Sequence, residues 1–186
     1  MFVLTKKGWL VSGVVVEPSP NFDARPSYAV VDTIVIHNIS LPPSQFDGDG
    51  VRQLFTNCLA SDEHPYYVHI AGLRVSAHFF IRRDGELIQF VSTEDRAWHA
   101  GVSCWRGRER CNDFSVGIEL EGCDTLPFEP VQYDRLVELL KVLCDRYPIR
   151  DIVGHSDIAP GRKTDPGPYF DWGVLRAAGL PRVRLD

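Results

Sequence analysis

The 186-residue sequence has no excess of basic residues, no internal repeat and no apolar run long enough to cross a membrane. Its 20 Lys and Arg against 25 Asp and Glu give a formal net charge of −5. A basic face for nucleic acid is therefore not expected, and we expect neither a nucleic-acid partner nor a membrane. Because no shift in composition marks a linker, we expect one domain over residues 1–186.

The five cysteines are odd in number and form no Cys-x-x-Cys pair. This disfavours a disulfide framework and favours reduced thiols in the cytoplasm. Near the N-terminus, Lys6 and Lys7 precede an apolar stretch over residues 8–16 and imitate a secretory leader. No small-residue cleavage site follows, so we interpret this stretch as a first strand or an extended arm.

Short apolar, β-branched runs predict the strands of the fold. Buried strands are expected over residues 30–37, 114–121 and 151–154. Two further runs, 76–83 and 86–91, flank Asp84-Gly85 and predict a hairpin with a type I′ turn.

Leucines at helical spacing predict one long helix over residues 130–147, with Pro130 in its first turn. Shorter helices are expected over 50–57 and 171–178, whereas 98–101 and 105–112 show no period and are interpreted as loops. The order of elements predicts an α/β or α+β fold, in which a mixed central sheet is flanked by one long helix and several short ones.

Two histidines end predicted buried strands, and a carboxylate follows in the next loop. These residues are His37, His155 and Asp165. Two imidazoles and one carboxylate suit Zn²⁺ better than Mg²⁺ or Ca²⁺, which prefer oxygen ligands. Three protein ligands leave a fourth position open, so the pattern predicts a catalytic zinc site.

Two charged residues are candidates for the chemistry at such a site. Glu119 lies inside an apolar strand, where a carboxylate needs a partner or a function. There it would orient a water molecule and move its proton, while Lys163 would neutralise an oxyanion. In the alternative interpretation, Glu119 pairs with an arginine across the sheet and Lys163 is a solvated loop charge.

The other four histidines compete with His37 as ligands. They are His64, His69, His78 and His99. His78 lies in a predicted hairpin strand, which favours a structural role, while His64 and His99 lie in loops that would border a cleft.

Eight blocks spread over most of the chain carry a family pattern. They are residues 8–11, 35–43, 73–78, 81–86, 96–103, 107–115, 117–122 and 154–167. In this order they resemble the zinc-dependent N-acetylmuramoyl-L-alanine amidases of the amidase_2 family, most closely the cytoplasmic type that acts in peptidoglycan recycling. The match is loose over 48–50 and 61–70, where preference for peptide length or sugar form would differ.

The resemblance implies zinc ligands at His37, His155 and Asp165 and catalytic roles for Glu119 and Lys163. The implied reaction is hydrolysis of the amide between the lactyl group of N-acetylmuramic acid and L-alanine in a muropeptide, with the anhydromuramyl-peptide as preferred substrate. The chain is expected to act as a monomer.

Four further residues fall in blocks that resemble the family's substrate cleft. They are Asn38, Arg74, Trp98 and Arg110. Arginines suit peptide carboxylates, and a tryptophan face suits a sugar ring.

Two other interpretations stay open at the level of sequence. In one, the chain is a non-catalytic peptidoglycan-binding module, although such modules typically lack a metal ligand. In the other, it is a structural or regulatory zinc protein whose fourth position is closed by Cys111 or His99.

Overall fold

The three runs predicted as buried strands form neighbouring parallel strands in a computed structural model that describes residues 2–180. They are β3 (Thr33–Ile39), β9 (Ser115–Glu121) and β10 (Asp151–Gly154). All seven residues of β9 are buried, as expected for a central parallel strand that is covered on both faces. Residue 1 and residues 181–186 of the expected domain lie outside the described part.

The sheet has six strands in the order β1-β5-β4-β9-β3-β10. Strand β4 (Phe79–Ile81) pairs in parallel with β9 and antiparallel with β5 (Leu87–Gln89). Strand β1 (Val15–Val16) runs parallel to β5 at the edge, so the N-terminal stretch is largely an extended arm. The predicted mixed sheet is confirmed.

The hairpin between β4 and β5 is confirmed, but the type I′ turn is wrong. That turn needs a positive φ at both central residues, whereas only Gly85 has one, at 85°. The N–H of Arg82 donates to the Glu86 carbonyl, and the N–H of Gly85 donates to the Arg82 carbonyl. The loop therefore has three residues, with Gly85 in the left-handed position.

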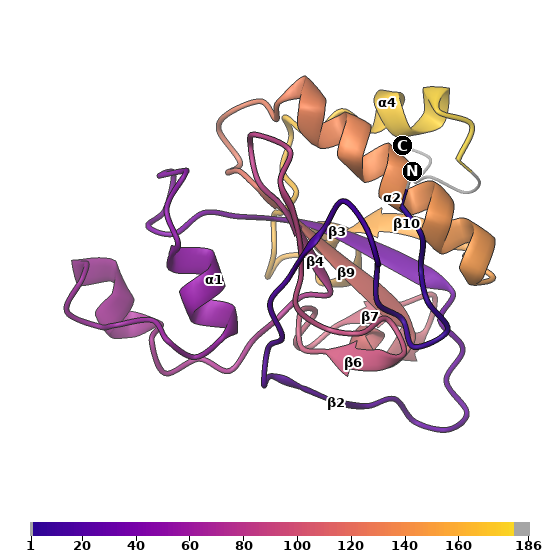
Figure 1. The fold of residues 1–186 in the computed structure, drawn as a ribbon, viewed down its shortest axis with the longest axis horizontal. Helices are drawn as coiled ribbons and strands as arrows, with labels where there is room; N and C mark the ends of the chain where they lie inside the picture. Colours follow the sequence, from indigo (N-terminus) through magenta and orange to yellow (C-terminus); the bar gives the residue numbers. More distant parts are fainter. Residues whose placement is uncertain (1, 181–186) are drawn as a thin grey trace.

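Helix α2 (Pro130–Arg146) lies across one face of the sheet beside α4 (Trp172–Ala177), as Figure 1 shows. Its buried side chains include Leu136, Leu140 and Leu143, which confirms the predicted stripe. They pack in one core with alternate residues of β3 and β9, among them Ile34, Ile36, Ile118 and Leu120. Because side chains alternate along a strand, His37 and Glu119 face away from α2.

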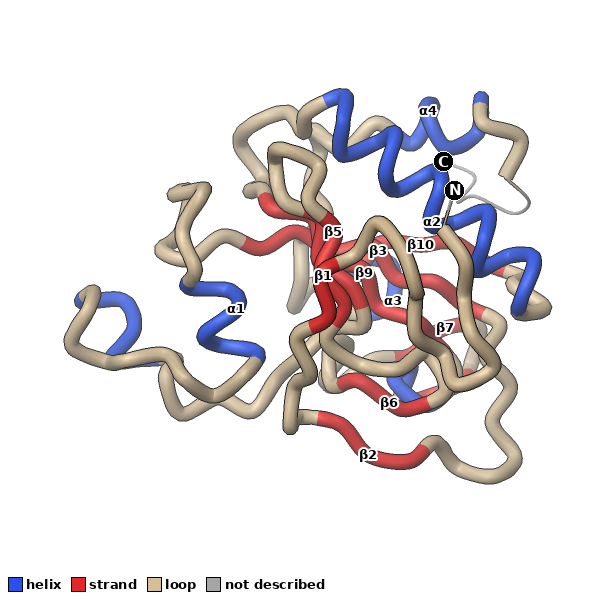
Figure 2. The backbone as a smooth tube through the Cα atoms, in the orientation of Figure 1, coloured by secondary structure: helices blue, strands red, loops and turns tan. Residues whose placement is uncertain are grey.

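The opposite face carries smaller elements. Helix α1 (Gly50–Phe55) and the 3₁₀ turn η1 (Pro65–His69) form a lobe that projects beside the sheet (Figure 1). Below the sheet, Figure 2 shows β2 (Phe22–Ala24) alongside β6 (Asp95–Ala97), with which it pairs antiparallel. None of the helices in residues 2–180 is both long and apolar enough to span a membrane.

Two segments expected to be loops contain short elements. The 105–112 segment takes part in a small hairpin of β7 (Cys104–Trp105) and β8 (Arg108–Glu109), followed by the 3₁₀ turn η2 (Cys111–Asp113). Helix α3 (His155–Ile158) begins the 154–167 loop. Elements of two to four residues are too short to give a period in the sequence.

Candidate active site

The register of the central strands brings the site together. His37 of β3 lies opposite Glu119 of β9, and Gly154 of β10 lies opposite Ile36. His155, the next residue after Gly154, therefore comes to the level of His37. Three neighbouring parallel strands thus present two imidazoles and a carboxyl group near the same edge of the sheet. The sequence predicted that His37 is the last residue of its strand. In the structure, β3 continues for two more residues, to Ile39.

Three possible metal-binding atoms converge above these strands. The Nδ1 atoms of His37 and His155 lie 3.0 Å apart, and the Oδ2 atom of Asp165 lies 3.0 Å from each of them. Among the residues that the structure describes, these three form the one cluster of His, Cys, Asp or Glu side chains that could hold a metal ion. The sequence therefore selected the residues that the fold brings together.

Burial and mutual contacts determine the electrostatics of this cluster. Burial lowers the pKa of His37 to about 4, with the neighbouring His155 and Lys163 acting in the same direction. Burial alone would raise the pKa of Asp165, but its close contacts with the rings of His155 and His37 outweigh burial and lower that pKa below its ordinary value. At neutral pH the cluster therefore offers a neutral His37 ring and an ionised carboxylate, the forms that bind metals.

Contacts on the outer side of both rings bear on which nitrogens carry protons. The Nε2 atom of His155 lies 3.0 Å from the carbonyl oxygen of Ala100, which can only accept. The Nε2 atom of His37 lies 2.9 Å from Nδ1 of His99. If both Nε2 atoms donate, both Nδ1 atoms present lone pairs toward the Asp165 carboxylate.

Three acceptor atoms so close together repel one another unless a cation lies between them. Ligands about 2.0–2.1 Å from a tetrahedral zinc ion lie about 3.3 Å from each other, close to the observed spacing. Two imidazole nitrogens and one carboxylate oxygen also match the ligands that zinc binds at catalytic sites. The donor set and its spacing therefore fit zinc.

Glu119 lies beside this cluster with a buried carboxyl group. Its Oε1 atom lies 4.0 Å from Nδ1 of His37, and its Oε2 atom has no hydrogen-bond partner among the described residues. Burial raises the pKa of Glu119 well above its ordinary value, and the Asp165 charge adds to this, while Lys163 opposes it. Among residues 2–180, no arginine forms an ion pair with Glu119, contrary to the alternative sequence interpretation.

A cleft of about 570 Å³ opens over the cluster. Glu119, His155, Lys163 and Asp165 line it. The Lys163 side chain is exposed, and its charge affects both His37 and Glu119. An ammonium group on a loop that borders the cleft can meet negative charge that develops on a bound substrate.

The remaining histidines do not join the cluster. His99 is buried and contacts the outer nitrogen of His37, so it lies behind this residue and not beside the convergent atoms. His78 is fully buried, accepts a hydrogen bond from the Gly117 N–H and contacts the Asp95 carbonyl, as expected for a structural histidine. His64 accepts from the backbone of Tyr66 at the start of η1.

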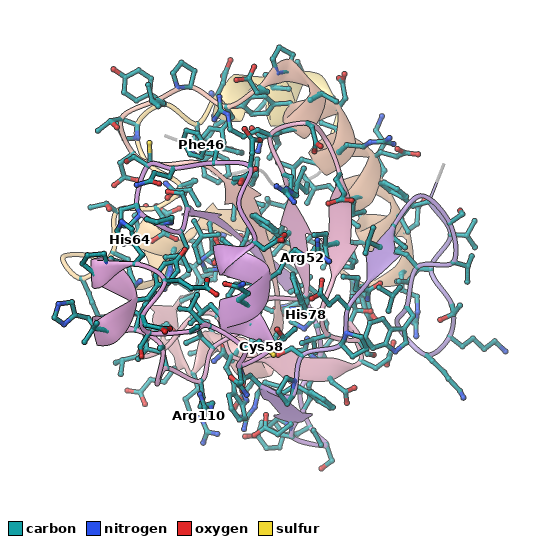
Figure 3. All side chains as sticks on the ribbon, turned by 60° about the vertical axis from the view of Figure 1, so that its left-hand side comes forward. Phe46, Arg52, Cys58, His64, His78 and Arg110 are labelled. Carbon is teal, nitrogen blue, oxygen red and sulfur yellow. The ribbon has the colours of Figure 1, made fainter. Side chains whose placement is uncertain are left out.

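The four residues expected in the substrate cleft have different environments. Asn38 lines the cleft, and its amide nitrogen donates to Asp124 and to the carbonyl of Pro166. Trp98 is half-buried and donates to Asp23, and the exposed Arg74 contacts the Leu73 carbonyl. Arg110 projects at the periphery of the molecule in Figure 3 and lies beside Asp113. Only Asn38 of these four lines the 570 Å³ cleft.

Three residues outside the sequence-based set contact the site. Asp124 accepts from Asn38, Arg162 donates to the Ala100 carbonyl, and Asn112 accepts from the N–H groups of His99 and Ala100. Asn112 and Arg162 lie inside two of the blocks that carry the family pattern, but the sequence did not indicate which residues they contact. Gly117 is a partial signal in the sequence, since a glycine inside a predicted strand can mark a close approach by another segment. In the structure, a Cβ atom at this position would lie 2.4 Å from the ring of His99.

Comparison with known proteins gives consistent matches over nearly the whole chain. A family model described as N-acetylmuramoyl-L-alanine amidase matches residues 27–168. The chain is 53% identical to the 1,6-anhydro-N-acetylmuramyl-L-alanine amidase AmpD of Escherichia coli, over 94% of this chain and 96% of the relative. The fold also matches a crystal structure of an AmpD derivative with a TM-score of 0.91 and 52% identity, over 95% and 99% of the two chains.

A more distant structure contains a bound substrate. It is the amidase AmiD from E. coli with anhydro-N-acetylmuramic acid-L-Ala-D-γ-Glu-L-Lys, which matches with a TM-score of 0.60 and 30% identity. The match covers 96% of this chain and 66% of that one.

Proposed function

This chain belongs to the N-acetylmuramoyl-L-alanine amidase family, and we propose that it is a zinc enzyme which hydrolyses the amide between the lactyl group of 1,6-anhydro-N-acetylmuramic acid and L-alanine. The observation that carries the proposal is the convergence of two histidine nitrogens and one carboxylate oxygen beside an unpartnered, buried carboxyl group at the floor of a cleft. The similarity to AmpD supports the anhydro sugar and a role in peptidoglycan recycling.

His37, His155 and Asp165 would hold the zinc ion. When bound, zinc polarises a carbonyl group and lowers the pKa of water to about 7, which supplies hydroxide at neutral pH. The three proposed ligands come from strand β3, from the start of α3 directly after β10, and from the loop that follows α3. The adjoining cleft gives substrate access to the open side of this site.

Glu119 acts as the proton carrier in this proposal. Its carboxylate accepts the proton of the attacking water and delivers it to the amide nitrogen of L-alanine, so that the C–N bond breaks and a free amine leaves. Its raised pKa supports this role, because a carboxylate with a raised pKa is a stronger base toward the water proton. Its unpartnered Oε2 atom is available for the water.

Lys163 supplies positive charge for the oxygen of the attacked carbonyl, which becomes negative as the carbon turns tetrahedral. Asn38 is the expected substrate contact that the cleft position supports, through its amide oxygen, since its amide nitrogen is engaged. Substrate binding by Arg74, Trp98 and Arg110 stays a prediction from the family resemblance.

A cytoplasmic location and a monomeric state complete the proposal. The five cysteines are all free, which supports a reducing compartment. The 1,6-anhydro substrate named in the relatives supports a recycling role.

The test combines metal analysis with a product assay. Purified protein is expected to carry about one zinc per chain and to convert anhydromuramyl-tripeptide into free tripeptide and anhydromuramic acid, detected by mass spectrometry. A protein that holds zinc and binds this muropeptide but releases no peptide would favour the non-catalytic peptidoglycan-binding module instead.

A further inference from the structure

The outer nitrogens of the two candidate histidine ligands contact adjacent residues of one loop. His37 Nε2 lies 2.9 Å from the side chain of His99, and His155 Nε2 lies 3.0 Å from the carbonyl oxygen of Ala100. Both loop residues are buried, with exposed fractions of 9% and 0%. One dipeptide therefore contacts both rings on the side opposite the convergent Nδ1 atoms.

The protonation pattern of His99 follows from a chain of hydrogen bonds that ends on a backbone carbonyl. The hydroxyl of Ser115 donates to the carbonyl oxygen of Cys111 over 2.6 Å. Having used its one proton, Ser115 must accept from Nε2 of His99, 3.2 Å away. The ring is buried, and its two nitrogens contact the His37 ring and the Ser115 hydroxyl, with no ion pair to a carboxylate among the described residues, so the ring is neutral.

A neutral His99 that donates through Nε2 must accept through Nδ1. His37 therefore donates from Nε2, and its Nδ1 atom carries a lone pair. At His155, the Ala100 carbonyl lies 3.0 Å from Nε2 and can only accept, whereas the guanidinium of Arg162 lies farther from Nε2, at 3.5 Å, and donates to the same carbonyl. Nε2 of His155 therefore carries the proton. Both rings are set in the tautomer that presents Nδ1 to a metal ion.

The dipeptide itself is fixed by one side chain. Asn112 Oδ1 accepts from the N–H groups of His99 and Ala100, at 3.2 and 2.8 Å. Behind the ring of His99, the strand has Gly117, where a Cβ atom would lie 2.4 Å from the ring. The loop can approach β9 this closely only because residue 117 is glycine.

We propose that the His99-Ala100 dipeptide, anchored by Asn112, is a positioning element that selects the tautomers of His37 and His155 and thereby prepares the site for zinc. The identity of the metal in this proposal rests on the proposed function. The tautomers of His37 and His155 do not depend on it. Partners of this kind typically change metal affinity by about 10- to 100-fold when removed.

The first test reads the ring nitrogens of the metal-free, full-length protein by ¹⁵N NMR. We expect both His37 and His155 to carry the proton on Nε2 and none on Nδ1. A proton on Nδ1 of His37 in the wild-type protein would overturn the inference without recourse to any variant. If the protein bound no zinc, the proposed function would fail. The protonation of the His37 and His155 nitrogens would still show whether the His99-Ala100 dipeptide selects their tautomers.

The second test compares substitutions at residue 99 by zinc competition with a chelator. His99→Leu removes the acceptor and is expected to weaken zinc binding by about 10- to 100-fold and to shift His37 toward the Nδ1–H tautomer. His99→Asn places an amide oxygen near the former Nδ1 and should restore most of the affinity. Wild-type affinity and an unchanged His37 tautomer in His99→Leu would contradict the inference.

The Asn112 anchor offers an independent pair of variants. Asn112→Ala should weaken zinc binding, whereas Asn112→Asp keeps an acceptor oxygen and should retain it. His78→Asn is the matched control, since His78 is a buried histidine next to His99 that contacts neither candidate ligand. It should lower thermal stability and leave the tautomers of His37 and His155 unchanged. Equal zinc affinities for Asn112→Ala and the wild type would show that Asn112 is not needed to position the His99-Ala100 dipeptide.

Discussion

Glu119 is buried and has a carboxyl oxygen without a hydrogen-bond partner among the described residues. An unsatisfied buried polar group costs about 1–3 kcal/mol of folding free energy. A residue that contributes only to stability would not have this cost. The geometry of Glu119 therefore supports the proposed catalytic role over a purely structural one.

Glu119→Gln tests this explanation. The amide keeps the shape but cannot take a proton, so the turnover number should fall by about 10²-fold or more. The zinc content should stay near one per chain, because Glu119 is not among the convergent donors. Loss of zinc in this variant would instead make Glu119 a ligand. Thermal stability should rise or stay constant, since a neutral buried side chain replaces an ionisable one.

The candidate ligand residues could be selected from the sequence, while the residues that support them could not. His37 and His155 each adjoin a β-branched run, and such runs are visible in the sequence. The contact between His37 and His99 joins residues 62 positions apart, and the loop that carries His99 shows no period. The sequence therefore left several histidines as candidate ligands, and only the fold shows which of them cluster with Asp165.

At the scale of elements, the loop after Asp165 is held against the segment that follows β9. Asn38 donates to Asp124 and to the Pro166 carbonyl, which joins three segments beside the candidate ligand. Gly167 has φ of +81° and lies so near Asp124 that a Cβ atom would be 2.6 Å from Oδ1 and 2.9 Å from Cα of that residue. Since one of these atoms belongs to the backbone, the segment must shift to admit a side chain.

Gly167→Ala should therefore weaken zinc binding and destabilise the fold by about 1–3 kcal/mol, measured by chelator competition and urea unfolding. Gly161→Ala is the matched control in the same loop. Its φ is +75°, but no atom lies within 4 Å of the added Cβ, so it shares the backbone strain without the clash. If both variants bind zinc as the wild type does, the close contact with Asp124 does not position Asp165.

The order and type of the main elements were accessible from sequence, but local details were not. The stripe of Leu136, Leu140 and Leu143 correctly predicts α2, because an amphipathic helix needs such a face to cover a sheet. The Asp84-Gly85 dipeptide predicted the hairpin but not its turn, since the loop length depends on how β4 and β5 pair. The elements of 104–113 are stabilised by tertiary contacts, among them Arg108 with Asp32.

For the whole molecule, a group of buried neutral histidines links stability to pH. Burial, together with the nearby Arg25, lowers the pKa of His78 from 6.5 to about 3. The folded state therefore holds fewer protons than the unfolded state at pH values between these two. The stabilisation is fully present above about pH 6.5 and is lost as the pH falls toward 3.

We expect the free energy of unfolding of the metal-free protein to decrease below pH 6.5, by at most about 1.4 kcal/mol per pH unit for each such histidine. Urea unfolding at pH 7, 6 and 5 measures this. His78→Asn should be less stable than the wild type at pH 7 but should lose less stability on acidification. Parallel pH dependences of the two proteins would show that His78 is not buried in a neutral form.

The account as a whole depends on a metal ion held by His37, His155 and Asp165. The most direct measurement is a zinc titration of chelator-treated protein, with release of tripeptide from anhydromuramyl-tripeptide as the readout. Turnover should be absent without metal and should rise linearly to a plateau at one zinc per chain. Full turnover by protein shown to be free of metal, or a plateau at a different stoichiometry, would contradict the account.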